Sequence, residues 1–227
     1  MIVQRKGAKR KGTKMFINEK KELIKAGMKL DRYGLIALSG GNVSMRMPSG
    51  EILMSPSGMI YEELEADDVV VVDIEGNVIE GKRRPSSDIE ALLYIFRKMP
   101  EVNAVIHTHQ PYATGIGLVM DEFPCTLTTL ANAAQGPVSV APYSAPNSLL
   151  MGQNTVEYLN GKLAVILKHH GVVSVGNSLK QALYACVYLE EAAKAYVAAK
   201  SISGNTALLT DEQIAETVEV FRTYGQK

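Results

Sequence analysis

The chain has 227 residues, which is enough for one large domain or two small ones with a substantial core. A hydrophobic fraction of 46% and a charged fraction of 21% are ordinary for a globular protein. Basic and acidic residues number 24 each, but residues 1–14 hold six of the basic ones and no acid. The rest carries 18 basic and 24 acidic residues, which excludes a broad surface for nucleic acid.

Residues 1–14 are predicted to be a basic, disordered extension, with Met15 as the natural first residue of the folded domain. They lack the apolar core of a secretory signal peptide. No apolar run approaches the ~20 residues that a membrane-spanning helix needs, so no membrane partner is expected. Cys125 and Cys186 are too few for a disulfide framework and fit the reducing cytoplasm, where we expect the protein to be.

The N-terminal half predicts a helix followed by paired strands. Asn18 can cap a helix whose apolar residues recur at helical spacing and which Gly34 ends. A glycine-rich turn at 39–42 leads into an alternating strand at 43–47, and a Pro-Ser-Gly turn joins this strand to one at 51–54 as a hairpin. The elements expected next are a strand pair at 69–72 and 78–79 and a helix at 87–98.

In the C-terminal half strands and helices alternate. A buried strand at 102–106 precedes His107, and Pro111 opens a short helix, where its missing N–H costs nothing. Thr210 to Gln213 form a capping box for the last helix, which is expected to end at Tyr224-Gly225. The other predicted elements are strands at 138–141 and 163–175 and helices at 149–159 and 178–201. We therefore predict one α/β domain over residues 15–227, with a largely antiparallel central sheet flanked by helices.

All four histidines occur in two pairs, His107-Thr108-His109 and His169-His170. In His-x-His on a strand both rings project from the same face, and each pair follows a buried apolar run. A single histidine at a strand end more often only hydrogen-bonds the backbone. Two strand ends that meet, however, would give three or four nitrogens to one divalent metal. Because strand side chains alternate, His169 and His170 cannot both face the same ion.

Asp88 follows Pro85-Ser86-Ser87 at the start of the predicted helix. Ser87 and Glu90 have the spacing of a capping box, which places Asp88 in the first helical turn. Two interpretations stay open. The Asp88 carboxylate can simply complement the helix dipole, or it can lie beside the metal as a ligand or general base.

Three short segments are rich in hydrogen-bond donors: the loops 39–42 and 55–58 and the helix start at 86–87. Glycines let the backbone approach an anion, and serine and asparagine add donors. Free N–H groups at a helix start also bind anions. Each loop alone is an ordinary turn, but together the three indicate a phosphate pocket.

Five motifs, in this order and at these separations, resemble the class II aldolase/adducin-head family. They are Gly41-Asn42-Val43-Ser44, Ser55-Pro56-Ser57-Gly58, Pro85-Ser86-Ser87-Asp88, His107-Thr108-His109 and His170-Gly171. The similarity covers about residues 16–227 and is greatest to the L-fuculose-1-phosphate aldolase branch of the family, which residues 209–225 also resemble.

The resemblance implies a metal-dependent aldolase that cleaves a ketose 1-phosphate to dihydroxyacetone phosphate and an aldehyde through a zinc-stabilised enediolate. It makes His107, His109 and His170 the zinc ligands, although this ligand set also suits Mn²⁺ or Co²⁺. Asp88 becomes a further ligand in the resting enzyme and the base during turnover, and Tyr224 positions the aldehyde. The residues at phosphate-binding positions are Gly41, Asn42, Ser57, Gly58, Ser86 and Ser87. The expected partners are a phosphorylated sugar and copies of this chain in a homotetramer with active sites at subunit interfaces.

Two departures from the fuculose enzymes keep the substrate open. Asp88 stands where those enzymes have glutamate, and Thr128 stands where they have a proton-donating tyrosine, a far stronger acid than a threonine hydroxyl. The alternatives within the family are a 5-deoxyribulose or 5-methylthioribulose 1-phosphate aldolase, a dehydratase and a decarboxylase. A non-catalytic adducin-type interaction module is the alternative from another functional class.

Overall fold

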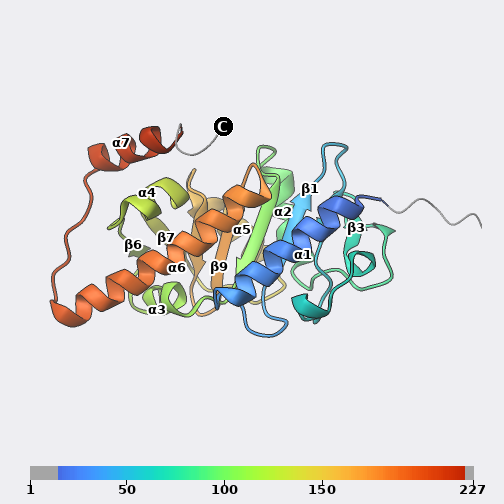
Figure 1. The fold of residues 1–227 in the computed structure, drawn as a ribbon, viewed down its shortest axis with the longest axis horizontal. Coiled ribbons are helices and arrows are strands. Elements are labelled where there is room, and N and C mark those ends of the chain that lie inside the picture. Colours follow the sequence, from blue (N-terminus) through green and yellow to red (C-terminus); the bar gives the residue numbers. More distant parts are fainter. Residues whose placement is uncertain (1–14, 223–227) are drawn as a thin grey trace, which may run out of the picture.

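The computed structural model describes residues 15–222 as a sheet with helices on both faces (Figure 1). Its strands are β1 (Asn42–Arg46), β2 (Ile52–Met54), β3 (Val70–Val72), β4 (Val78–Glu80), β5 (Ala104–Thr108), β6 (Glu122–Phe123), β7 (Val138–Ala141), β8 (Ala164–Leu167) and β9 (Gly171–Gly176). Among the described residues they form one nine-stranded sheet in the order β4-β3-β2-β1-β5-β9-β8-β7-β6. Only β7 and β8 pair in parallel there. The predicted single α/β domain with a largely antiparallel sheet is confirmed.

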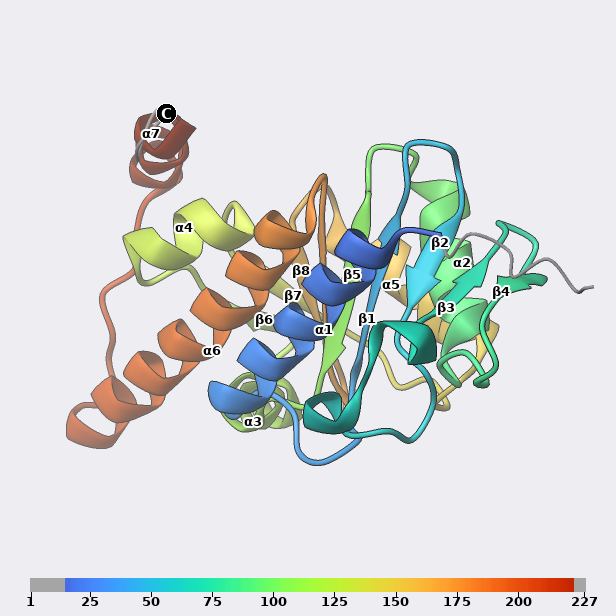
Figure 2. The same ribbon diagram turned by 45° about the vertical axis from the view of Figure 1, so that its right-hand side comes forward.

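The helices are α1 (Ile17–Arg32), α2 (Ile89–Lys98), α3 (Pro111–Val119), α4 (Thr128–Ala134), α5 (Leu149–Leu159), α6 (Leu179–Ile202) and α7 (Asp211–Arg222), with short 3-10 turns η1 (Tyr61–Glu63) and η2 (Ala66–Asp68). Figure 2 shows α1, α3 and α6 in front of the sheet, whereas α2 and α5 lie behind it. None of the helices in residues 15–222 combines the length and the apolar character that a membrane span requires.

Alternation along the strands determines which helices each side chain meets. Ala104 and Ile106 of β5 pack with residues of α1 and α6, whereas Val105 packs with residues of α2 and α5. By the same period of two, His107 belongs to the α2 face and Thr108 to the α6 face. The histidines and the start of α2 therefore lie on the same side of the sheet.

Several predicted elements are confirmed. The first hairpin pairs β1 with β2, with Met45 opposite Leu53. The helix predicted at 149–159 is α5. The capping box of α7 forms, because Thr210 N donates to Gln213 Oε1 at 3.0 Å and Gln213 N donates to Thr210 Oγ1 at 3.3 Å. The predicted end of this helix at Tyr224-Gly225 and the extension 1–14 lie outside the described residues.

Two predicted helix starts are wrong. α1 begins at Ile17 after Phe16, so Asn18 is a residue of its first turn and not its cap. α2 begins at Ile89 with Asp88 as its N-cap residue, and no side chain caps it. The capping box of Ser87 and Glu90 is absent because the chain turns earlier, where Asp88 N donates to Ser86 Oγ at 3.3 Å. The strand β6 and the helix α4 were not predicted.

Candidate metal centre

The sheet order brings the two histidine pairs together at the same end of neighbouring strands. β5 pairs with β9, and His107 lies opposite Val173. His169 and His170 belong to the turn between β8 and β9. On the other side of β5, Asn42 at the start of β1 lies opposite His107. The predicted meeting of two histidine-bearing strand ends is thus confirmed.

Three imidazoles gather at this point. His107, His109 and His170 each offer a nitrogen, and these nitrogens all lie within 4.8 Å of one another. His107 Nε2 and His109 Nε2 are 3.0 Å apart. Two nitrogens bound tetrahedrally to one zinc ion at 2.0–2.1 Å would be about 3.3 Å apart. The spacing of His107 Nε2 and His109 Nε2 is therefore close to that of two ligands of one divalent cation, and His170 lies near enough to be a third.

The hydrogen bonds of the rings also fit a metal. His107 Nδ1 lies 2.9 Å from the carbonyl oxygen of Val172, so Nδ1–H donates and Nε2 carries the free lone pair. His170 Nδ1 is buried and has no hydrogen-bond partner among the described residues. A buried polar atom without a partner is costly, and a cation beside it would remove that cost.

Burial keeps these rings neutral, as metal binding requires. Burial, together with the neighbouring His170 and His109 rings, lowers the pKa of His107 to about 3, although the hydrogen bond with Val172 O acts in the opposite direction. Partial burial also lowers the pKa values of His109 and His170, and the negative charge of Asp88 opposes this lowering in both. At neutral pH the three nitrogens are therefore available as ligands.

The fourth histidine lies outside the cluster. His169 is exposed and has a φ of +62°, a left-handed conformation that is uncommon for residues other than glycine. The chain turns at this residue, and His170 N donates to Leu167 O at 3.0 Å. The turn directs His170 toward His107 and leaves His169 facing solvent.

Glycines let neighbouring backbone approach the histidine strand. Gly41 has a φ of +76°, and a Cβ there would lie 2.5 Å from the carbonyl oxygen of His107. A Cβ on Gly171 would lie 2.2 Å from the carbonyl oxygen of Thr108. Any larger residue at either position would push against the backbone that carries His107 and His109.

Asp88 is buried and held from two directions. Asn42 Nδ2 donates to its Oδ2 at 2.7 Å, and Asn147 N donates to its Oδ1 at 3.2 Å. The carboxylate gives α2 no side-chain cap. Among the described residues, the three histidines are the one group of three or more potential ligand residues close enough together to hold a metal, and this group does not include Asp88. The geometry favours a role next to the histidines over helix capping alone.

Asn147 is a contact of this site that the sequence analysis missed. It lies in the loop between β7 and α5 with a φ of +62°. Its contact with Asp88 is made by the backbone N–H, and the two residues are 59 positions apart in the sequence. No side-chain motif could therefore predict this contact. Pro146-Asn147 marks a turn, and this was the available signal.

The three donor-rich segments also converge. Pro56 and Pro85 form an isolated β-bridge, and Ser57 N donates to Arg84 O at 3.0 Å. Asn42 contacts the end of the segment 85–88, because its Nδ2 donates to Asp88 Oδ2. These contacts place the three segments next to one another; the predicted phosphate-binding positions on them are Gly41, Asn42, Ser57, Gly58, Ser86 and Ser87. Of these, Ser57, Gly58 and Ser87 are exposed.

Of the two further predicted positions, the structure describes only Thr128. Thr128 is the first residue of α4 and is exposed, and α4 packs against α6 and α7. Tyr224 lies outside the described residues.

The sequence model of one protein family, described as the Class II Aldolase and Adducin N-terminal domain, matches residues 21–197. A 5-deoxy-D-ribulose 1-phosphate aldolase of Bacillus thuringiensis serovar kurstaki is 35% identical over 211 residues, which cover 92% of this chain and 98% of the relative. The L-fuculose phosphate aldolase of Escherichia coli K12 is 30% identical over 205 residues, which cover 90% and 94%.

A solved structure of an L-fuculose 1-phosphate aldolase superposes with a TM-score of 0.85 at 31% identity, covering 92% of this chain and 98% of that one. The match of sequence and fold extends over nearly the whole described chain. The chain belongs to the class II aldolase and adducin N-terminal domain family.

Proposed function

We propose that this chain is a metal-dependent aldolase that cleaves a ketose 1-phosphate to dihydroxyacetone phosphate and an aldehyde. The observation that carries the proposal is the cluster of three neutral imidazoles beside the buried carboxylate of Asp88. The donor-rich segments next to this carboxylate supply a place for a phosphate. Relatives named as phosphosugar aldolases support the same class of substrate.

His107, His109 and His170 are the proposed ligands of the metal, with Asp88 as a further ligand in the resting enzyme. Zn²⁺ is the proposed ion, and Mn²⁺ and Co²⁺ suit the same donors. The cation supplies Lewis-acid stabilisation of the negative charge that develops on the ketose oxygens as the carbon–carbon bond breaks.

Asp88 is the proposed base for the carbon-bound proton. In the condensation direction it removes a proton from the carbon of dihydroxyacetone phosphate that forms the new bond, and in cleavage it returns that proton. Asn42 and Asn147 each take one lone pair of its two oxygens and so fix the direction in which the remaining lone pairs point. Fixed direction and close approach make such a transfer efficient.

The phosphate is proposed to bind at Gly41, Asn42, Ser57, Gly58, Ser86 and Ser87. Backbone N–H groups and hydroxyls can hold a phosphate without a lysine. Space at Gly58 is open, since no atom lies within 4 Å of the position of a Cβ there. The variable aldehyde half of the substrate is proposed to face Thr128 and Tyr224.

A panel of ketose 1-phosphates, assayed for triose phosphate with and without chelator, tests this proposal. L-fuculose 1-phosphate and 5-deoxyribulose 1-phosphate are the two primary substrates, because relatives of both kinds match this chain. The first leaves a three-carbon aldehyde and the second a two-carbon aldehyde. Loss of water or of carbon dioxide would instead indicate a dehydratase or a decarboxylase. Absence of both metal binding and turnover would favour the non-catalytic module.

We also propose a homotetramer in the cytoplasm. Exposed apolar side chains on the described surface, such as Val119 of α3 and Ile202 of α6, fit a surface that other subunits cover. Cys125 and Cys186 are both free, which fits a reducing compartment. Light scattering of the purified protein would measure the number of subunits.

A further inference from the structure

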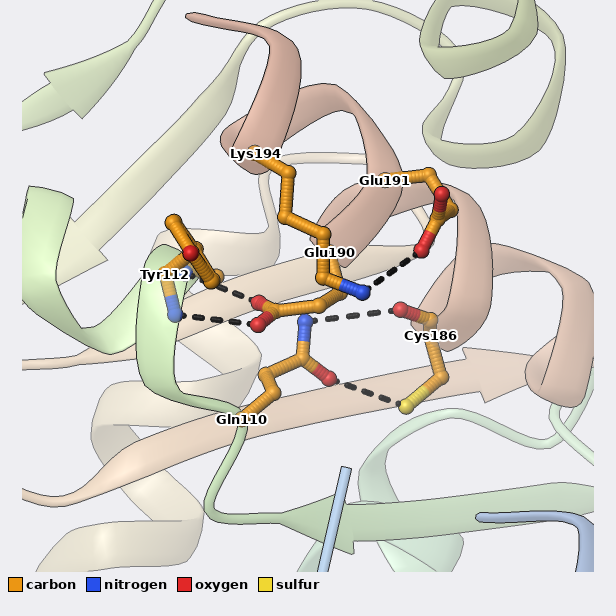
Figure 3. A network of polar contacts seen from close by, with 7 residues as sticks. Gln110, Tyr112, Cys186, Glu190, Glu191 and Lys194 are labelled. Carbon is orange, nitrogen blue, oxygen red and sulfur yellow. Dashed lines mark hydrogen bonds and ion pairs between the residues drawn. The ribbon is translucent and has the colours of Figure 1, made fainter. Parts of the chain in front are cut away.

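A buried glutamate of α6 has no part in the proposed chemistry. Glu190 is 1% exposed and receives two backbone hydrogen bonds, from Tyr112 N at 3.0 Å and from Ala113 N at 2.9 Å (Figure 3). Its cationic neighbour on the helix, Lys194, pairs with Glu191 instead. Burial raises the pKa of Glu190. Burial of a carboxylate costs free energy, so Glu190 is expected to have a structural role that an exposed surface charge does not have.

Glu190 completes the start of α3. The N-cap residue Gln110 makes no side-chain cap, and Pro111 has no N–H to satisfy. The next two free N–H groups, of Tyr112 and Ala113, both go to Glu190. The carboxylate thus takes over from a distant helix the role that an N-cap side chain usually has, and its charge suits the positive end of the helix.

The same stretch of α6 also holds the residue just before α3. Gln110 Oε1 accepts from Cys186 Sγ at 3.1 Å, and Gln110 Nε2 donates to Cys186 O at 3.4 Å (Figure 3). Gln110 Oε1 also accepts from Thr108 Oγ1 at 2.8 Å. Burial raises the pKa of Cys186 to about 12, so the thiol keeps the proton that it donates. Thr108 and Gln110 are both fully buried.

These contacts bracket a proposed metal ligand. His109 is exposed, yet the residues on both sides of it are fixed to α6 on the opposite face of the sheet. Its own N–H donates to Leu35 O at 3.0 Å, which leaves its backbone little freedom. The ring of His109 is therefore held near His107 by the backbone corner between β5 and α3 (residues 108–113), and not by contacts of the ring alone.

We propose that Glu190 is a positioning residue of the three-histidine centre. With Cys186 and Gln110 it holds the corner between β5 and α3, so that His109 Nε2 stays at ligand distance from His107 Nε2. The inference rests on the proposed metal site. It adds a residue that touches neither metal nor substrate and that acts through the backbone of residues 108–113.

Binding of Co²⁺ to the metal-stripped full-length protein tests this, because its visible absorption reports both affinity and ligand geometry. Glu190→Gln keeps the side-chain shape but can accept from only one of the two N–H groups and places its own NH₂ against the other. We expect Co²⁺ to bind about tenfold more weakly than to the wild type, the lower end of what outer contacts contribute, with altered absorption bands. Glu191→Gln, on the exposed side of α6, is the matched control and should leave affinity and bands unchanged.

Each variant is titrated at a temperature at which circular dichroism shows it folded. A folded Glu190→Gln protein with wild-type affinity and wild-type bands would overturn the inference and reduce Glu190 to a link between α3 and α6. Failure of the wild type itself to bind Co²⁺ would instead overturn the metal site on which the inference rests. The two failures are therefore distinguishable.

A second pair of variants decides the matter if Glu190→Gln does not fold. Cys186→Ser keeps a donor for Gln110 Oε1, whereas Cys186→Ala removes it. We expect the alanine variant to bind Co²⁺ roughly threefold more weakly than the serine variant, which is the loss of one hydrogen bond expressed as a binding constant. Equal affinities and equal bands for the two would contradict a positioning role for this network.

Discussion

Asn42 Nδ2 lies 2.7 Å from Asp88 Oδ2, and this buried hydrogen bond joins the start of β1 to the start of α2. Asn42 also lies opposite His107 in the sheet register. One asparagine thus connects the histidine cluster, the proposed base and the proposed phosphate loops. The hydrogen bond determines the direction in which the Asp88 carboxylate faces.

Asp88→Asn should preserve metal binding and lose turnover. The amide is isosteric but can accept from only one of Asn42 and Asn147, so we expect the free energy of unfolding to fall by about 1 kcal/mol. Removal of a proton-transfer group should lower kcat by about 10²–10⁴-fold. Zinc content, urea unfolding and triose phosphate release measure the three effects. A twofold loss of kcat would make Asp88 a structural residue, and Glu157→Gln on the exposed side of α5 is the control.

His109→Ala should abolish metal binding, whereas His169→Asn should retain it. His169 is exposed and has a positive φ, which asparagine tolerates. Metal at 100 times its dissociation constant stabilises a folded protein by about 2.7 kcal/mol. Added Zn²⁺ should therefore raise the unfolding temperature of the wild type and of His169→Asn but not of His109→Ala. Wild-type turnover in His109→Ala would refute the ligand assignment.

Gly41→Ala should be more damaging than Gly34→Ala. Both glycines have similar positive φ values, +76° and +69°, so both alanines carry about 1–2 kcal/mol of backbone strain. Only at position 41 would the new Cβ meet another atom, the carbonyl oxygen of His107 at 2.5 Å. We expect a larger loss of stability and weaker metal binding in Gly41→Ala alone. Equal losses in urea unfolding would show that only strain matters.

Asn147 should act through its backbone. Asn147→Gly keeps both the positive φ and the N–H that holds Asp88, so kcat should stay close to the wild type. Asn147→Ala also keeps the N–H but adds strain of about 1–2 kcal/mol, which thermal unfolding would detect. A large fall of kcat in the glycine variant would contradict this and assign a function to the Asn147 side chain.

The two thiols should be unreactive in the folded protein. Burial raises the pKa of Cys186 to about 12 and also raises the pKa of Cys125, so neither is a thiolate at pH 8. A thiol reagent such as Ellman's should therefore react only after addition of denaturant. Fast reaction of one thiol in the native protein would show that the segment around it opens.

Local pattern was sufficient to predict most of the fold. The strand hairpin at β1 and β2, the helix α5 and the capping box of α7 depend on periodicity and on turn residues within a few positions. The starts of α1 and α2 were predicted wrongly because they depend on contacts that such local patterns do not contain. Asp88 N, for example, is taken by Ser86 Oγ, and the carboxylate is turned away toward Asn42.

The sequence by itself determined that His107 and His109 share one face, because strand side chains alternate. Only one of His169 and His170 joins them, but alternation is not the reason: the strand predicted at 163–175 is wrong, since residues 168–170 form a turn that divides it into β8 and β9. The tertiary structure alone decided that His170 turns inward, since the left-handed residue His169 lies in a turn set by the pairing of β8 with β9. It also decided what holds Asp88 and the corner after His109, because Asn42, Asn147 and Glu190 are 46 to 78 residues from their partners along the chain. Contacts at that separation follow from the order of strands in the sheet, which no local spacing encodes.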